Sequence, residues 1–165
     1  YVFSKDILEN GEARLNDACY LSQGEIWADG VLEVEAFGST DLGISFFLGL
    51  DGKLIFHAGD LNNWHWKEES TEEEVREAEN AYLAELEILA RRTDRVDLVM
   101  FPVDPRLGQE YMLGAKQFVD RFRVGMFVPM HFDEGYARAN AFREYAESRG
   151  VRFVELTYRG EEFRI

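Results

Sequence analysis

Cysteine, proline and histidine are all scarce in this chain of 165 residues, which has one cysteine, three prolines and three histidines. The single cysteine, Cys19, excludes an internal disulfide framework and a cysteine-based zinc finger. No apolar run approaches the roughly 18 residues of a membrane-spanning helix. The opening residues, YVFSKDILEN, carry charge and lack the long apolar stretch of a secretory signal. These absences predict a soluble, cytoplasmic protein.

Basic residues are also few, because 18 Lys and Arg stand against 32 Asp and Glu, which gives a formal net charge of −14. Phosphate backbones and anionic membranes repel such a chain, so we expect no nucleic-acid partner and no membrane partner. A small-molecule substrate suits the composition better. The apolar share of 46% and the aromatic share of 14% suffice for one hydrophobic core. We therefore predict a single domain over residues 1–165.

Short strands are predicted in the first third of the chain, and strands alternate with helices after it. Residues 31–37 alternate apolar and acidic side chains, as a half-buried strand does. Asp51-Gly52 is a strong hairpin signal between residues 44–50 and 53–60. Two apolar runs, VDLVMFPVD at 96–104 and GMFVPMHF at 125–132, are typical of buried strands. The pattern indicates a mixed α/β fold.

Three helices are predicted, beginning near Thr71, Gly114 and Tyr136. The first has the clearest signal, because Ser70 and Thr71 precede glutamates by three residues, as in a capping box, and apolar residues recur at helical spacing behind them. The end of the chain predicts a hairpin around Arg159-Gly160. Polar residues that end strands in such α/β chains are where chemistry is usually found.

Two of the three histidines and one aspartate stand at or near predicted strand ends. His57, beside apolar residues, is interpreted mainly as a structural histidine with a satisfied hydrogen bond. Asp60 follows Gly59 at the end of a strand, so it is either a turn residue or a hard oxygen ligand for a metal. His131 ends the strand of residues 125–131 and is either a loop-capping histidine or a second ligand.

The loops offer further candidates with two interpretations each. His65 lies between Trp64 and Trp66, which indicates either a packed loop cluster or the wall of a pocket beside Asp60. The loop GSTDLG at 38–43 is either a turn or a segment that points Ser39 or Asp41 at a site. Asp104 and Arg106, in a rigid loop that contains two prolines, are interpreted as a loop-fixing ion pair. No GxSxG, P-loop or GxGxxG motif is present.

Four segments, in this order, resemble the metallo-β-lactamase-fold superfamily of metal-dependent hydrolases: GSTDLGISF, FHAGDLNNWHW, FPVDPRLGQEYMLGA and VPMHF. The resemblance runs from about Val31 to Phe132 and covers the C-terminal two-thirds of that fold. It implies an αββα sandwich, incomplete at the N-terminus, with a metal site at one edge. Asp60 falls where the family has its metal-bridging aspartate, and His131 falls where it has its last ligand histidine.

The chain departs from the family pattern in its other ligands. The motif HxHxDH is absent, Ser39 stands where a ligand histidine often lies, and only three histidines are available. Because zinc requires three or four protein ligands, two ligands alone predict weak binding. We expect the chain to be a C-terminal fragment whose Tyr1 enters just after the missing motif, or a remnant that has lost catalysis.

The leading hypothesis is a hydrolase that uses a metal-activated water, with a phosphodiester, lactone, amide or thioester as substrate. The resemblance implies a divalent cofactor, zinc first, with manganese and iron as alternatives. Asp60 and His131 are the predicted metal ligands, and Asp60, Asp41 and His65 are the predicted catalytic groups. The competing hypothesis is a non-catalytic binding or assembly module on the same fold. A lone fragment is also expected to self-associate through its uncovered apolar surface, as a homo-oligomer.

Overall fold

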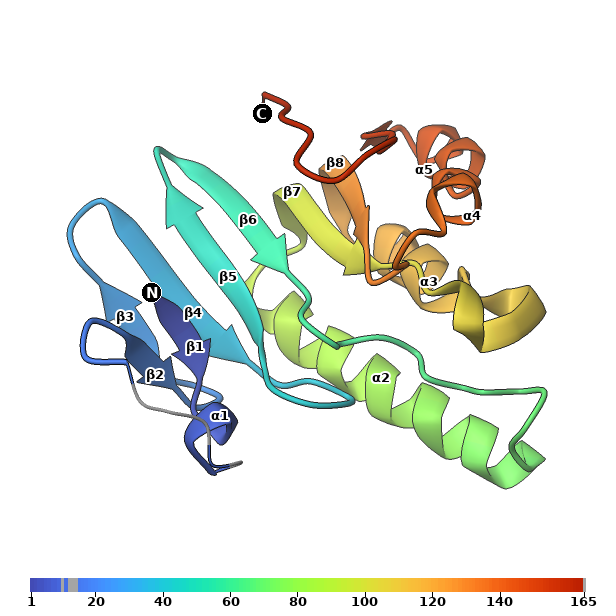
Figure 1. Cartoon of the computed structure of the whole chain (residues 1–165), viewed down its shortest axis with the longest axis horizontal. Coiled ribbons are helices and arrows are strands. Elements are labelled where there is room, and N and C mark those ends of the chain that lie inside the picture. Colours follow the sequence, from blue (N-terminus) through green and yellow to red (C-terminus); the bar gives the residue numbers. More distant parts are fainter. Residues whose placement is uncertain (10, 12–14, 165) are drawn as a thin grey trace.

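A computed structural model describes residues 1–9, 11 and 15–164 of the chain (Figure 1). Strands and helices follow one another along the sequence in the α/β order that its patterns predicted. The elements are β1 (Val2–Ser4), α1 (Asp6–Glu9), β2 (Cys19–Leu21), β3 (Ile26–Ala28), β4 (Leu32–Phe37), β5 (Ser45–Leu50), β6 (Lys53–His57), α2 (Glu72–Arg92), β7 (Arg95–Pro102), the 3₁₀ helix η1 (Pro105–Glu110), α3 (Leu113–Arg121), β8 (Arg123–Met130), α4 (Tyr136–Asn140), α5 (Arg143–Ser148) and β9 (Arg152–Phe153).

One sheet of seven strands, in the order β3-β4-β5-β6-β7-β8-β9, forms the centre of the molecule. Strands β3 to β6 pair antiparallel, and β6 to β9 pair parallel. The predicted hairpin joins β5 to β6, with Leu50 opposite Lys53 and positive φ angles of 49° at Asp51 and 73° at Gly52. Parallel pairing brings the carboxyl ends of β6, β7 and β8 to one edge, where the loops that carry polar side chains begin.

Helix α2 begins as the sequence predicted. The Thr71 hydroxyl accepts a hydrogen bond from the Glu74 backbone N–H, and the Glu74 carboxylate accepts one from the Thr71 N–H, which completes the capping box. Tyr82, Leu86 and Leu89 form its buried face. Among the helices of the described residues, none has the length and apolar character to cross a membrane.

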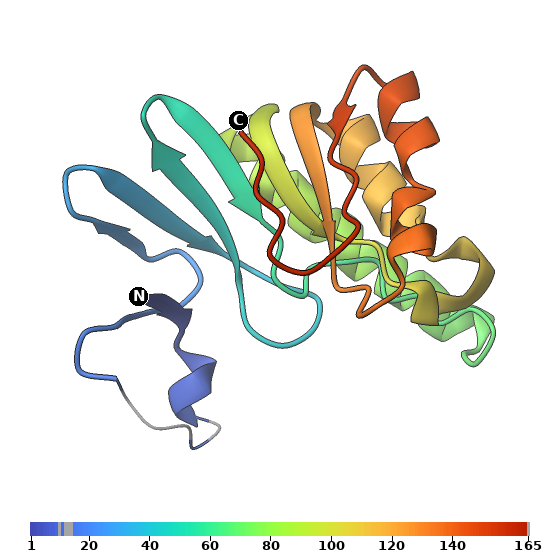
Figure 2. The ribbon, with the colours of Figure 1, turned by 45° about the horizontal axis from the view of Figure 1, so that its top comes forward.

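The main core lies between the sheet and the helices α2, α3 and α5. It is rich in phenylalanine: the Phe56 and Phe118 rings stack at 5.4 Å, and the Phe101 ring lies 4.9 Å from Phe118. Figure 2 shows α2 and α3 behind the sheet, with the C-terminal segment crossing in front of β7 and β8. The helical layer therefore covers one face of the sheet, which leaves the second face to shorter segments.

The second face of the sheet carries two smaller apolar clusters. One lies under β1 and β2 and includes Leu21, Val34 and Ala36. The other lies on β7 and β8 and packs against Val154 and Leu156 of the C-terminal segment. The described residues thus form one helical layer on one large sheet, with two smaller apolar clusters on the other face of that sheet.

Two sequence predictions about the last third of the chain were wrong. The helix expected from Tyr136 begins there but is divided into two helices. Between them the Phe142 N–H donates to the carbonyl three residues back, at Ala139, and not to the carbonyl four residues back as in an α-helix. The hairpin expected around Arg159 does not form within the described residues. Strand β9 instead pairs parallel to β8, so the segment that follows it lies over the sheet.

Candidate functional site

Asp60 is placed at the sheet edge by a sharp turn after β6. The strand ends at His57, and Gly59 adopts a left-handed φ of 56°. A Cβ on Gly59 would lie 2.6 Å from the Ile44 carbonyl oxygen, so both the turn and the space require glycine here. The Leu61 N–H donates to the Ala58 carbonyl and closes the turn, and the Asp60 side chain remains 35% exposed at the carboxyl end of β6.

His131 follows β8 directly and also has a left-handed backbone, with a φ of 64°. Such a conformation is uncommon outside glycine and is found at sites where a side chain must be directed. It brings the imidazole Nε2 to 3.4 Å from Asp60 Oδ1. The prediction that these two side chains converge on one site, although 71 residues separate them in the sequence, is confirmed.

Asp104 and Arg106 form the ion pair that the sequence predicted, and the pair extends to His131. The Asp104 side chain is 1% exposed and accepts hydrogen bonds from Arg106 Nε at 3.0 Å and Arg106 Nη2 at 2.6 Å. The Arg106 backbone N–H donates to the same carboxylate at 2.9 Å. The other contact of Asp104 Oδ2 is His131 Nδ1, at 2.9 Å.

These contacts determine the charge of Asp104. Burial raises the pKa of the Asp104 carboxyl, but hydrogen bonds from Arg106 and His131 outweigh it, so the pKa lies below its ordinary value. The same interaction with Asp104 raises the pKa of Arg106. Asp104 is therefore an anion that accepts hydrogen bonds and donates none.

An ionised Asp104 assigns the proton of His131 to Nδ1. A carboxylate at 2.9 Å from Nδ1 requires a donor there, whereas the second neighbour of Nδ1, Arg106 Nη2, lies further away at 3.3 Å. In neutral His131, Nε2 then presents a lone pair to Asp60 Oδ1. Two lone pairs that face each other at this distance repel, unless a proton or a cation lies between them.

Trp64 and Trp66 form an aromatic wall beside this pair. Trp64 Nε1 donates to the Asp60 carbonyl at 2.7 Å, and its ring lies 5.3 Å from the His131 ring. Trp66 stacks on Trp64 at 6.3 Å and has a left-handed φ of 39°. Both tryptophans also pack against the main core, so the structure does not decide between the packed loop cluster and the pocket wall.

His65 lies in the same loop but turns inward. It is 1% exposed, its Nδ1 accepts from the Lys67 N–H at 3.2 Å, and its Nε2 lies 3.3 Å from the Glu110 carbonyl oxygen. Burial lowers its pKa, although the Glu110 carbonyl acts in the opposite direction. Both ring nitrogens thus have backbone partners, as in a packed loop cluster. Its catalytic role stays a prediction.

Asp41 lies on the loop between β4 and β5, and this loop is hydrogen-bonded to the loop that contains Asp60 and Asn62. The Thr40 hydroxyl donates to the Asn62 carbonyl at 2.6 Å and accepts from the Asn62 N–H at 3.0 Å. Ser39 accepts from the Asp41 N–H at 3.3 Å, as a turn residue does. Asp41 is exposed, and its charge contributes to the raised pKa of Arg106. Its catalytic role also stays a prediction.

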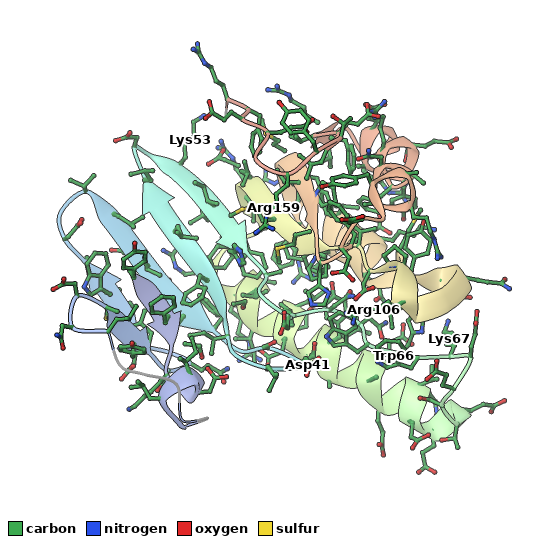
Figure 3. The ribbon with its side chains drawn as sticks, viewed as in Figure 1. Asp41, Lys53, Trp66, Lys67, Arg106 and Arg159 are labelled. Atoms are coloured by element: carbon green, nitrogen blue, oxygen red, sulfur yellow. The ribbon has the colours of Figure 1, made fainter. Side chains whose placement is uncertain are left out.

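Figure 3 shows the placement of these groups. Asp41, Arg106 and Trp66 lie at one end of the sheet, and Lys53, at the start of β6, lies at the other.

The third histidine, His57, has the structural contact expected of it, because its Nδ1 accepts from the Gly59 N–H at 3.0 Å. Burial lowers the pKa of His57, and the nearby charge of Asp60 only partly opposes this.

The donor atoms of the site suit a divalent metal ion in part. Asp60 Oδ1 and His131 Nε2 suit such an ion in kind and in position. Among the described residues, however, no group of three or more His, Cys, Asp or Glu side chains is placed to hold a metal ion. The two side chains thus fit as part of a metal site and do not complete one.

Asp104 is the site residue that the sequence did not reveal. Its pairing with Arg106 was predicted, whereas its contact with His131 was not. The available signal was its position two residues after β7, at the same edge as Asp60 and His131. Parallel neighbouring strands bring such positions together, although the sequence alone does not state which strands are neighbours.

Comparisons with known proteins support the fold. No protein-family model and no curated protein sequence matches the chain. Among solved structures, a protein from Parabacteroides distasonis, provisionally described as a metal-dependent hydrolase, matches 93% of this chain and 62% of its own, at 14% identity and a TM-score of 0.61. CmlA, a diiron β-hydroxylase from Streptomyces venezuelae, matches 86% of this chain and 33% of its own, at 14% identity and a TM-score of 0.58.

These likenesses show the fold alone: the chain shares the mixed α/β fold of these two structures, as its sequence pattern predicted. The chain spans less than two-thirds of the length of either structure. The relation between Asp60 and His131 therefore occurs on part of such a fold.

Proposed function

We propose that this chain forms part of the active centre of a metal-dependent hydrolase, with Asp60 and His131 as two ligands of a divalent metal ion. The approach of Asp60 Oδ1 to His131 Nε2, at 3.4 Å, is the observation that carries the proposal. An oxygen and a nitrogen lone pair face each other, and a cation between them removes their repulsion. Two ligands do not complete a metal site, so the proposal requires further ligands besides these two.

Two features of the surroundings support a metal ligand role for His131. Metal-bound histidines generally donate their second ring N–H to a carboxylate or carbonyl, which fixes the tautomer. Asp104 accepts that bond at 2.9 Å, and Arg106 holds Asp104 in place through three hydrogen-bonding nitrogen–oxygen contacts from its side chain. The described structural relatives include one named as diiron and one as metal-dependent.

The proposed reaction is hydrolysis of a small molecule with a phosphodiester, lactone, amide or thioester group. A divalent ion, zinc first and manganese or iron as alternatives, would supply positive charge that activates water near neutral pH. The chain's own residues then orient the site: Asp104 holds His131, and Trp64 and Trp66 exclude solvent on one side. Asp41 and Asp60 are the carboxylates available for proton transfer.

The experiment is a metal titration of the 165-residue chain, with zinc, manganese and ferrous ions followed by calorimetry and tryptophan fluorescence. Trp64 lies 5.3 Å from His131, so its emission should respond to an ion at the site. We expect weak binding of one ion, reduced at least tenfold by Asp60→Asn and by His131→Ala. The control Asp51→Asn, at the hairpin tip, removes one carboxylate far from the site and should leave binding unchanged.

A non-catalytic binding module on the same fold is the second candidate. The incomplete donor set among the described residues favours it. It predicts that wild type, Asp60→Asn and His131→Ala bind each metal equally weakly, and that no ester, lactone or phosphodiester is hydrolysed when metal is added. The titration therefore separates the two functions.

A further inference from the structure

A cavity of about 740 Å³ lies beside His131 and is not used by the metal-ligand proposal. One wall is the end of β8 with residues His131 to Glu134, and the other is the C-terminal segment, including Tyr158, Arg159 and Phe163. This volume is in the range of small-molecule sites. Figure 2 shows the C-terminal segment crossing the sheet with its lowest bend near the carboxyl ends of the strands.

Hydrogen bonds from α4 hold the start of the C-terminal wall in place, and bonds within the segment fold it into a turn. Asn140 Nδ2 donates to the Leu156 carbonyl at 2.8 Å, and the Leu156 N–H donates to Asn140 Oδ1 at 3.1 Å. The Thr157 N–H then donates to Glu161 Oε2 at 3.0 Å, and the Thr157 hydroxyl donates to the other oxygen of that carboxylate. These bonds close a turn over residues 157–161 with Arg159 at its tip.

Arg159 has no carboxylate partner among the described residues and lines the cavity. Arg106, Arg143 and Arg149, for example, form ion pairs with Asp104, Glu155 and Asp120. None of the ion pairs found among the described residues involves Arg159, although Asp133 and Glu134 line the same cavity and Glu161 shares its turn. Figure 3 shows its side chain over the sheet, beside β7.

A free guanidinium on a cavity wall has a clear chemical use in this chain. The net charge of −14 repels small anions, so an anionic ligand needs a local cation to bind. A guanidinium presents paired N–H groups that match the two oxygens of a carboxylate or a phosphate. The turn supplies that group to the cavity that His131 also lines, and His131 contacts Asp60.

We propose that Arg159 binds the acidic group, a carboxylate or a phosphate, of a small-molecule substrate that occupies this cavity. The proposal rests on the proposed function, because it places the rest of the substrate at Asp60 and His131. Arg159 then determines specificity: it selects molecules with an anionic group and rejects neutral analogues of the same shape.

The test is a binding titration of the 165-residue chain by NMR, with inorganic phosphate and succinate as probes and succinamide as the neutral control. We expect phosphate or succinate to bind in the millimolar range, and which of the two binds more tightly distinguishes the acidic group. Succinamide should not bind. Arg159→Gln should weaken binding at least tenfold, and Arg159→Lys less. Arg152→Gln removes an exposed arginine from β9 and should leave the dissociation constant unchanged.

Equal affinity of wild type and Arg159→Gln would overturn the proposal, as would equal binding of succinamide. Arg159 is exposed at a turn tip, so thermal melting within about 1 °C of wild type should confirm that the variant folds. The metal titration is an independent measurement. If the wild-type chain binds the anions but shows no metal binding at Asp60 and His131, the proposed function alone is contradicted. If it binds metal there but binds no anion through Arg159, the Arg159 proposal alone is contradicted.

Discussion

His131 Nδ1 lies 2.9 Å from Asp104 Oδ2, and this contact determines which nitrogen His131 turns towards Asp60. Asp104 is buried, ionised and held by hydrogen bonds from Arg106, so it accepts a hydrogen bond from the His131 Nδ1–H and leaves the Nε2 lone pair free. Nε2 is the atom 3.4 Å from Asp60 Oδ1. One buried carboxylate thus prepares an exposed imidazole to act as a ligand, which is a positioning role.

Asp104→Asn should impair metal binding without touching either proposed ligand. The asparagine amide can donate to Nδ1, which would move the His131 proton to Nε2 and block the lone pair that faces Asp60. Loss of such a supporting carboxylate typically costs about 10- to 100-fold in metal affinity. Calorimetry should show that loss, and ¹⁵N NMR of the imidazole should show the change of tautomer.

The matched control for this substitution is Asp133→Asn. It removes the same charge from an exposed residue near Arg106, without a described hydrogen bond to His131. The Asp133→Asn variant should retain the wild-type tautomer of His131 and the wild-type affinity for metal. If Asp104→Asn binds metal as tightly as this control, the positioning role is wrong.

Gly114→Ala should destabilise the fold near the site. A Cβ at residue 114 would lie 2.0 Å from Asn62 Oδ1 and 2.9 Å from the Asn63 backbone nitrogen, both of which are buried. Overpacking of this kind costs roughly 1–3 kcal/mol in the free energy of unfolding. Urea denaturation measures it. Gly49→Ala is the control, since its Cβ would make an ordinary 3.8 Å contact with Glu33, and a comparable loss there would refute the steric explanation.

Thr71→Ala should weaken the start of α2. The variant loses the side-chain oxygen that accepts from the Glu74 N–H, and such a cap is worth about 1 kcal/mol. Denaturation should show that decrease in unfolding free energy. Ser70→Ala, one residue earlier and outside the capping box, should change stability by less than half as much. Equal effects of the two substitutions would mean that the cap does not stabilise the helix.

Stability should fall as the pH drops below about 6.5, through His57 and His65. Burial places the pKa of each below the ordinary 6.5, so the unfolded chain binds more protons than the folded chain in this range. The free energy of unfolding therefore decreases with pH until the folded pKa values are reached. His57→Gln and His65→Gln should each show a shallower slope between pH 7 and pH 5 in paired denaturation series. Slopes equal to that of wild type would contradict this assignment.

Much of the fold was predictable because its signals are local. The capping box at Thr71 and the Asp51-Gly52 hairpin depend on residues that lie next to each other in the chain, and both formed as expected. The end of the chain was not predictable in the same way. Alternation after Val151 indicated a hairpin, but the bonds from Asn140 to Leu156 hold that segment against the rest of the molecule. Contacts between distant residues overrode the local pattern.

The candidate site was likewise predictable where its signals are local and not where it depends on contacts between distant residues. Asp60 and His131 were identifiable because each ends an apolar strand within a recognisable motif. The contact of Asp104 with His131 was missed, since it depends on β7 and β8 being parallel neighbours. The inward orientation of His65 likewise depends on the Glu110 carbonyl, 45 residues away.

The most direct test of the account is anomalous X-ray diffraction from crystals of this chain soaked in zinc chloride. The account predicts an anomalous peak about 2 Å from both His131 Nε2 and an Asp60 carboxylate oxygen. The same peak should be absent in crystals of His131→Ala. A zinc ion bound elsewhere, with the space between Asp60 and His131 empty at the same zinc concentration, would contradict the central claim.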